Sequence, residues 1–377
     1  MIALLVSAMY PLLGLIFDAQ LPRHRAVLAT MLFGFLFLPS LEFDVGGILY
    51  WNRNTAPVFV VLIGILFRDG ALLSRFRLRW FDAPMIAYCI APMFTAMDNG
   101  YGFKKGFVLS FYQSLRWAGP YFIARLHFQT KDQLLDLAYA LFIGGLIYVP
   151  LCLFEIRFSP VLHHHIYGFN QHSFAQSVRG STYRPIVFLQ HGLMVGMWMA
   201  MTAFLGWSLS VAGKLGRFMG VPLKWAAPIM FLVLVAMQSL GALILCLVIW
   251  FLVLLGRKTG SKFFLLTLAL FPLVWTSVRT SGALPTSTII DASFFVSADR
   301  ARSLETRLDA EDSLSRHAMR KPLLGWSTRG FNRADEEGTG HAQTADGLWL
   351  IAFATYGLLG LVSILFIFFL PSYLVLR

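Results

Sequence analysis

Long apolar runs alternate with short polar stretches along the whole chain. Many of the runs are roughly 15–25 residues long, about the length of a helix that crosses the hydrocarbon core of a bilayer. This pattern predicts an all-α polytopic membrane protein, with one integral membrane domain over residues 1–377 and about eleven transmembrane helices. The predicted spans are 2–18, 26–40, 55–67, 80–97, 106–124, 134–154, 187–211, 225–238, 241–256, 262–278 and 346–371.

Composition supports the membrane assignment. The chain is 57% hydrophobic and only 13% charged, which is far more apolar surface than a soluble domain of 377 residues can bury. A net charge of +12 could indicate nucleic acid as a partner, but basic residues in short loops that fix membrane orientation explain it better. We therefore predict membrane lipids as surroundings and no nucleic-acid partner.

Lysine and arginine are concentrated in one alternating set of loops, which the positive-inside tendency assigns to the cytoplasm. Two long loops then fall on the periplasmic side, a first at 155–186 and a larger one at 279–345. In the larger loop, an apolar stripe among mixed charges predicts a helix that ends before Pro322; the stripe is Ala301, Leu304, Leu308, Leu314 and Ala318.

Arginine is the main basic residue of the two long loops, and its planar guanidinium suits two-point contact with phosphate. Internal ion pairs are the alternative, and we favour them for Arg300, Arg302 and Arg316, which have acidic neighbours. For Arg179 and Arg184 the two interpretations are balanced. Arg279, at the outer end of a predicted span, is a further candidate for binding an anion.

Several polar residues fall within or at the mouths of predicted spans, where they need partners or water. We expect them to line a cavity; they are Glu155, Gln190, His191 and Arg116. For Arg116 the alternative is a structural clamp. The run His163–His165 has neither the spacing nor the companion ligands of a metal site, so we predict no metal. No nucleotide-binding glycine motif or acidic pair of a metal-dependent transferase is present, so we also predict no cofactor.

Three stretches resemble the O-antigen polymerase and O-antigen ligase superfamily of bacterial membrane enzymes. They are "RGSTYRPIVFLQHGLMVGMWM", "SLETRLDAEDSLSRHAMRKPLLGWSTRGFN" and "DGLWLIAFATYGLLGL". The last departs from the ligase pattern, because Asp346 stands where the family has a histidine, and His341 is the nearest histidine. Exopolysaccharide polymerase-like members share the "DGLW" form, which favours a polymerase.

The resemblance implies a glycosyltransferase bundle of the GT-C kind in the bacterial inner membrane, with its active face in the periplasm. The donor would be a glycan on undecaprenyl pyrophosphate, and the acceptor a second glycan. The family implies a pyrophosphate site, for which Arg179, Arg184, Arg307 and Arg279 are the candidates, and a catalytic base, which is Asp346 or His341. A helix cap is the equally weighted alternative role for Asp346. Partners of the same pathway would be a chain-length regulator or a flippase. A ligase that transfers the glycan to a lipid or protein, and a flippase or transporter, are the alternatives. We expect Gly357 and Gly360 to serve close helix packing.

Overall fold

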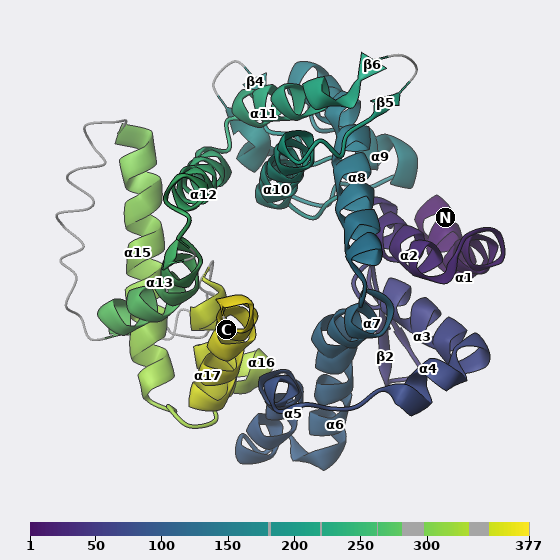
Figure 1. Ribbon diagram of the computed structural model, residues 1–377. Coiled ribbons are helices and arrows are strands. Elements are labelled where there is room, and N and C mark those ends of the chain that lie inside the picture. The colour runs from purple at the N-terminus through teal and green to yellow at the C-terminus, as the bar shows by residue number, and fades with distance from the viewer. Residues whose placement is uncertain (180–181, 219–220, 262, 281–297, 332–346, 377) are drawn as a thin grey trace. The chain divides into compact units, whose positions relative to one another are not determined.

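The computed structural model describes residues 1–376 except 180–181, 219–220, 262, 281–297 and 332–346 (Figure 1). Helices dominate these residues, and the strands they contain form short two-stranded hairpins. The all-α class is therefore confirmed. The chain forms two compact units, Met1–Phe76 with Gly119–Leu254 and Arg77–Ala118 with Leu255–Arg377. The single membrane domain stays a prediction.

The first unit contains most of the regular elements. Its helices are α1 (Ile2–Gln20), α2 (Arg23–Phe37), α3 (Ala56–Arg68), α4 (Gly70–Arg75), α7 (Gly119–His127), α8 (Lys131–Phe158), α9 (Leu162–Tyr167), α10 (Gly192–Val211), α11 (Ala226–Ala236) and most of α12 (Leu240–Thr259), with 3₁₀ turns at η3 (Phe174–Ser177) and η4 (Leu223–Trp225). Three hairpins join them: β1 (Phe43–Val45) with β2 (Leu49–Trp51), β3 (Val178–Arg179) with β4 (Thr182–Tyr183), and β5 (Arg217–Phe218) with β6 (Val221–Pro222).

The core of the first unit lies where α2, α8, α10 and α11 meet. Glycine lets α8 and α10 approach closely, because a Cβ at Gly145 would lie 2.3 Å from the Thr202 hydroxyl oxygen. The Tyr148 hydroxyl donates to the Leu36 carbonyl at 2.5 Å and joins α8 to the end of α2. The core thus packs these four helices into one bundle.

The second unit contains the turn η1 (Trp80–Asp82), α5 (Ala83–Asp98), α6 (Gly102–Gln113), the π-helical turn η2 (Ser114–Ala118), α13 (Phe263–Thr280), α15 (Ala298–Met319), α16 (Ser327–Gly330) and α17 (Leu348–Leu376). Tyr88 of α5 and Tyr356 of α17 pack edge to face with ring centroids 5.8 Å apart. The C-terminal half of α15 runs alongside the first half of α17, where Leu314 packs on Leu350 and Ala318 on Phe353.

Each of the predicted spans contains a helix, but the lengths differ. Within the described part of the chain, five helices are long and apolar enough to cross a membrane: α1, α8, α10, α12 and α17. The apolar helices Ala56–Arg68, Leu223–Ala236 and Leu266–Arg279 are shorter. A membrane protein is thus supported, while the count of eleven spans stays a prediction.

Two predicted boundaries are corrected. Helix α8 continues to Phe158, so the first long loop begins at Ser159 and Glu155 belongs to the helix. The predicted span at 187 begins as helix only at Gly192, because residues 184–191 are irregular. The second long loop contains α15, which ends at Met319 ahead of Pro322, and the predicted stripe is confirmed by buried Leu308, Leu314 and Ala318.

Candidate functional site

The irregular segment 184–191, "RPIVFLQH", is held by one buried carboxylate. Glu155 is 1% exposed. Its Oε2 accepts the N–H groups of Ile186 at 2.8 Å and Val187 at 2.7 Å, and Oε1 accepts the N–H of Leu162 at 3.0 Å. We expected Glu155 to line a cavity; instead, both of its oxygens bind backbone. Successive N–H groups that converge on one anion form a nest, and the carboxylate fills it.

Val187 carries backbone strain at the centre of this segment. Its φ is 52°, a left-handed conformation that is rare for a β-branched residue, and its side chain is fully buried. The Gln171 side-chain amide donates to the carbonyls of Val187 at 2.8 Å and Leu189 at 3.2 Å. The carboxylate on one side and the amide on the other therefore hold the strained conformation. Strain that is maintained in this way is found most often at functional sites.

Arg184 lies at the start of the segment and against the beginning of α10. The residue is 8% exposed, and its backbone N–H donates to the Ser177 carbonyl at 2.7 Å. Its aliphatic stem lies over Gly192, where a Cβ would come within 2.4 Å of the Arg184 Cδ. A side chain at position 192 would displace the arginine. Packing on Gly192 therefore restricts the aliphatic part of the Arg184 side chain.

The other candidates of the first unit lie on the same segment or next to it. His191 caps α10, since its Nδ1 accepts the Leu193 N–H at 3.0 Å, and its ring packs on His172 with centroids 4.5 Å apart. An accepting Nδ1 leaves the proton of a neutral ring on Nε2. Gln190 is exposed. Arg179 pairs through its backbone with Thr182, and its side chain lies outside the described part of the structure.

A polar cluster at the end of α2 was not foreseen. Arg53 is 1% exposed and donates to the Leu38 carbonyl at 2.9 Å and the Ser40 hydroxyl at 3.3 Å. His163 accepts the Ser40 N–H at 3.2 Å through Nε2, and its Nδ1 lies 2.8 Å from the Phe169 carbonyl oxygen. Burial lowers the pKa of Arg53 to about 10 and the pKa of His163 below its ordinary value. His163 is thus a neutral structural histidine. The only sign of Arg53 in the sequence is a single basic residue between two apolar stretches.

In the second unit, Arg279 is already surrounded by acids. The residue is 7% exposed; its Nε donates to Glu311 at 3.1 Å and its Nη2 to Asp312 at 2.7 Å. Trp349 donates through its indole N–H to the other oxygen of Glu311 at 3.1 Å. Arg279 therefore anchors the start of α17, and a pyrophosphate would have to compete with two carboxylates for it. Arg307 is exposed on α15.

The two catalytic candidates, Asp346 and His341, lie outside the described residues. The next residue along the chain, Gly347, is described, and a Cβ there would lie 3.2 Å from the Trp349 indole nitrogen. Arg116 belongs to the π-helical turn η2 and is exposed, rather than enclosed by the unit as a cavity-lining residue would be. π-helical turns recur at functional sites. The exposure of Arg116 is equally typical of an ordinary surface position, so it does not favour a functional role.

The "PLLGW" stretch, Pro322–Trp326, is inserted against a break in α17. Gly357 has φ 63° and ψ −155°, which interrupts the helix. The freed backbone groups pair with the inserted stretch: the Leu358 N–H donates to the Pro322 carbonyl at 2.7 Å, and the Trp326 N–H donates to the Ala354 carbonyl at 2.9 Å. The prediction that close helix packing explains Gly357 is therefore wrong. Its positive φ and the 2.3 Å between a Cβ there and the Leu323 carbonyl carbon require glycine.

Side chains at the end of α5 and just after it complete this junction. Thr95 donates to the Leu324 carbonyl at 2.7 Å and Asn99 to the Gly325 carbonyl at 3.0 Å. Lys321 donates to the Asn99 side-chain oxygen at 2.8 Å. Trp326 stacks on His317 with ring centroids 4.5 Å apart and donates to the His317 carbonyl at 2.8 Å. The sequence shows "PLLGW" as part of a stretch that resembles a known family, but it gives no sign of these partners.

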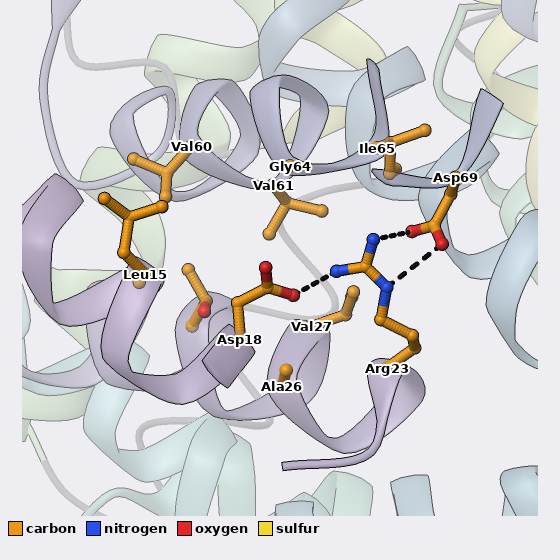
Figure 2. Close-up of a pocket in the computed structure, with 12 residues that line it drawn as sticks. Leu15, Asp18, Arg23, Ala26, Val27, Val60, Val61, Gly64, Ile65 and Asp69 are labelled. Atoms are coloured by element: carbon orange, nitrogen blue, oxygen red, sulfur yellow. Dashed lines mark hydrogen bonds and ion pairs between the residues drawn. The ribbon is translucent and has the colours of Figure 1, made fainter. Parts of the chain in front are cut away.

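A separate charged cluster joins the ends of α1, α2 and α3 in the first unit. Arg23 lies between two acids and donates to both Asp18 and Asp69, beside a small cavity of about 40 Å³ (Figure 2). Arg68 also pairs with Asp18, and the buried His127 places its Nε2 3.8 Å from Asp69. The charges balance within the cluster. It therefore ties the loops at this end together and resembles a structural network more than a binding site.

Among the described residues, no group of three or more histidine, cysteine, aspartate or glutamate side chains lies close enough together to hold a metal ion. Comparison with protein-family models, with curated proteins and with solved structures finds no match to this chain.

Proposed function

We propose that the chain is a membrane glycosyltransferase that polymerises glycan repeat units carried on undecaprenyl pyrophosphate. The observation that carries the proposal is the position of Arg184, which packing on Gly192 and a strained segment hold at the beginning of a candidate span. A leaving diphosphate is stabilised best by positive charge whose position is set before the reaction. The resemblance of three stretches to the O-antigen polymerase and ligase superfamily supplies the substrate class.

The sidedness of the proposal follows from the loops of the first unit. The loops that hold Asp18, Arg23 and Asp69 meet at one end, and the loops that hold Ser40 and His163 meet at another. We assign the end that carries Arg23, Arg25, Arg68 and Arg125 to the cytoplasm of a bacterial inner membrane, because basic short loops stay inside. Segment 184–191 would then face the periplasm.

The proposed reaction needs neither metal nor nucleotide. A hydroxyl of the acceptor glycan attacks the anomeric carbon of the donor, a new glycosidic C–O bond forms, and the bond to the pyrophosphate oxygen breaks. The proton of the hydroxyl passes to a base, for which Asp346 and His341 are the candidates. Arg184, with Arg179, would stabilise the charge that develops on the leaving undecaprenyl pyrophosphate.

The test uses purified protein and a synthetic undecaprenyl-pyrophosphate oligosaccharide, with glycan products separated by length. We expect a ladder from the wild type and about a 10²–10³-fold slower ladder from Arg184→Ala. Arg184→Lys should recover little, because a point charge does not reproduce the guanidinium geometry. The matched control is Arg157→Ala, an exposed arginine at the end of α8, which should leave the rate unchanged.

Other outcomes would overturn the proposal in distinct ways. Equal rates for Arg184→Ala and wild type would remove Arg184 from the site. A single transfer onto an added lipid or protein would establish a ligase, and movement of the lipid-linked glycan across vesicles without transfer would establish a flippase. Asp346→Asn retains helix-capping ability but removes the base; a full ladder from this variant would shift that role to His341.

Sidedness has its own test. In a background without the native cysteines, Ser173→Cys should react with an impermeant maleimide in intact spheroplasts. Ser74→Cys, on the exposed helix α4, should react only after lysis. The reverse pattern would place segment 184–191 in the cytoplasm and would contradict the proposed function.

A further inference from the structure

An apolar groove lies on the first unit, and none of its lining residues belongs to the proposed active site. Helix α2 forms its floor, and residues of α1 and α8 form its sides. Its volume is about 460 Å³, within the range of sites that bind small molecules. Both helices that flank it are candidate membrane spans, so in a bilayer the groove borders hydrocarbon.

The groove has one polar end and one apolar end. At the polar end, Arg25 donates through Nε and Nη2 to the two oxygens of Asp136, at 2.8 and 3.2 Å, and His24 approaches the same carboxylate at 2.8 Å. The Arg25 side chain is 56% exposed, and among the described residues its Nη1 has no hydrogen-bond partner. At the other end the lining is aromatic and aliphatic, including Phe37 and Ile147.

The length of the groove matches one leaflet. The lining positions on α2 run from Arg25 to Phe37, which is about 18 Å along a helix at 1.5 Å per residue. Half of a hydrocarbon core of about 30 Å is about 15 Å. An acyl chain laid along α2 would thus reach from the level of Arg25 to the middle of the bilayer.

We propose that this groove binds one phospholipid, with an acyl chain along α2 and its phosphate beside Arg25. The exposed outer edge of Arg25 at the mouth favours an anionic headgroup. Lys214 is a further basic residue close to the groove, since its backbone carbonyl accepts a hydrogen bond from Tyr139, which lines the groove. The lipid fills the space between α1 and α8 and supports the packing of α1 on α2.

The donor lipid of the proposed reaction does not explain the groove, because its pyrophosphate would lie elsewhere. Asp136 and Glu155 are 19 positions apart on α8, which is about 28 Å along the helix. The polar mouth of the groove and segment 184–191 are therefore at opposite ends of one span. A pyrophosphate bound near Arg184 cannot also lie at Arg25, so the groove needs its own lipid.

The test places the full chain in nanodiscs of phosphatidylethanolamine and phosphatidylglycerol. A trace of phosphatidylglycerol with a photoreactive group halfway along one acyl chain is added, and labelled peptides are identified by mass spectrometry. We expect labelling concentrated on α2 and the facing positions of α8. Ile143→Trp, which fills the groove, should reduce this labelling about tenfold. The matched control Leu153→Trp changes a similarly exposed residue of α8 outside the groove and should leave labelling unchanged.

Charge variants test the headgroup. Arg25→Gln should weaken capture of phosphatidylglycerol, whereas Asp136→Asn, which leaves the guanidinium unneutralised, should not. If Ile143→Trp fails to fold, the smaller Ala29→Leu takes its place, and the wild-type labelling map stands without either. Even labelling of all lipid-facing helices would mean ordinary annular lipid and would overturn the proposal. Displacement of the label by an equal amount of undecaprenyl phosphate would overturn it too, since the occupant would then be a polyprenyl lipid.

Discussion

The carboxylate of Glu155 offers the sharpest test of how segment 184–191 is held. We expect Glu155→Gln to lower stability, although glutamine has almost the same shape. Three backbone N–H groups point at the two carboxylate oxygens, at 2.7, 2.8 and 3.0 Å. A glutamine has one oxygen, so its NH₂ group must face at least one N–H donor.

The magnitude follows from the stranded groups. If the glutamine oxygen keeps Ile186 and Val187, the Leu162 N–H and the new NH₂ both lose partners in a position that is 1% exposed. Each buried unsatisfied group costs about 1–3 kcal/mol, which gives about 2–6 kcal/mol in total. At about 2–4 °C per kcal/mol, the melting temperature should fall by roughly 4–24 °C.

The assay is thermal unfolding of the purified protein, together with hydrogen exchange of the peptide that covers 184–191. The control is Glu42→Gln: Glu42 is exposed and accepts a side-chain hydrogen bond from Asn52 at 2.6 Å, which a glutamine can also accept. Its melting temperature should change little. If Glu155→Gln melts like the wild type and exchanges no faster at 184–191, the carboxylate does not hold the segment and the reasoning is refuted.

Two further predictions concern the glycine break and the buried histidine. Gly357→Ala should sharply reduce the yield of folded protein, because both the positive φ and the contact with Leu323 exclude a Cβ, while Gly241→Ala has open space and should be neutral in the same size-exclusion assay. Burial lowers the pKa of His163 in the folded protein. Below about pH 6.5 the unfolded chain therefore binds more protons than the folded chain, and the stability of the fold should decrease as the pH is lowered. His163→Gln should flatten this part of the melting-temperature profile, and exposed His164→Gln should not; identical slopes for both would contradict it.

Local pattern was enough to find the helices. Apolar runs placed a helix in every predicted span, and positive-φ Gln238 stands at the boundary that sequence placed between two of them. The stripe through Leu308 and Leu314 correctly predicted a helix in the second long loop. These features depend on residues within a few turns of one another, which is the range that periodicity can report.

The geometry of the candidate sites depends on partners far along the chain, which periodicity does not report. Val187 reads as the start of an apolar span, yet its conformation is set by Glu155, 32 positions away. Arg279 reads as an exposed donor at a span end, but α15 brings two acids against it. In both cases tertiary packing brings a buried polar group to a partner that is distant in sequence, and the apolar pattern does not predict which partner that is.

Two motifs that are separate in the sequence form one structural piece. Contacts from Trp349 to Glu311 and from Leu358 to Pro322 join the beginning and the break of α17 to α15 and to the turn that follows it. Gly347, the residue next to Asp346, therefore enters a helix whose first turns are fixed at two points. Substitutions in Pro322–Trp326 would then alter the proposed polymerase activity by shifting α17, with no contact to the proposed substrate. A loss of activity there would be evidence for a catalytic residue only if the fold of α17, measured by exchange at Ala354 and Leu358, stayed intact.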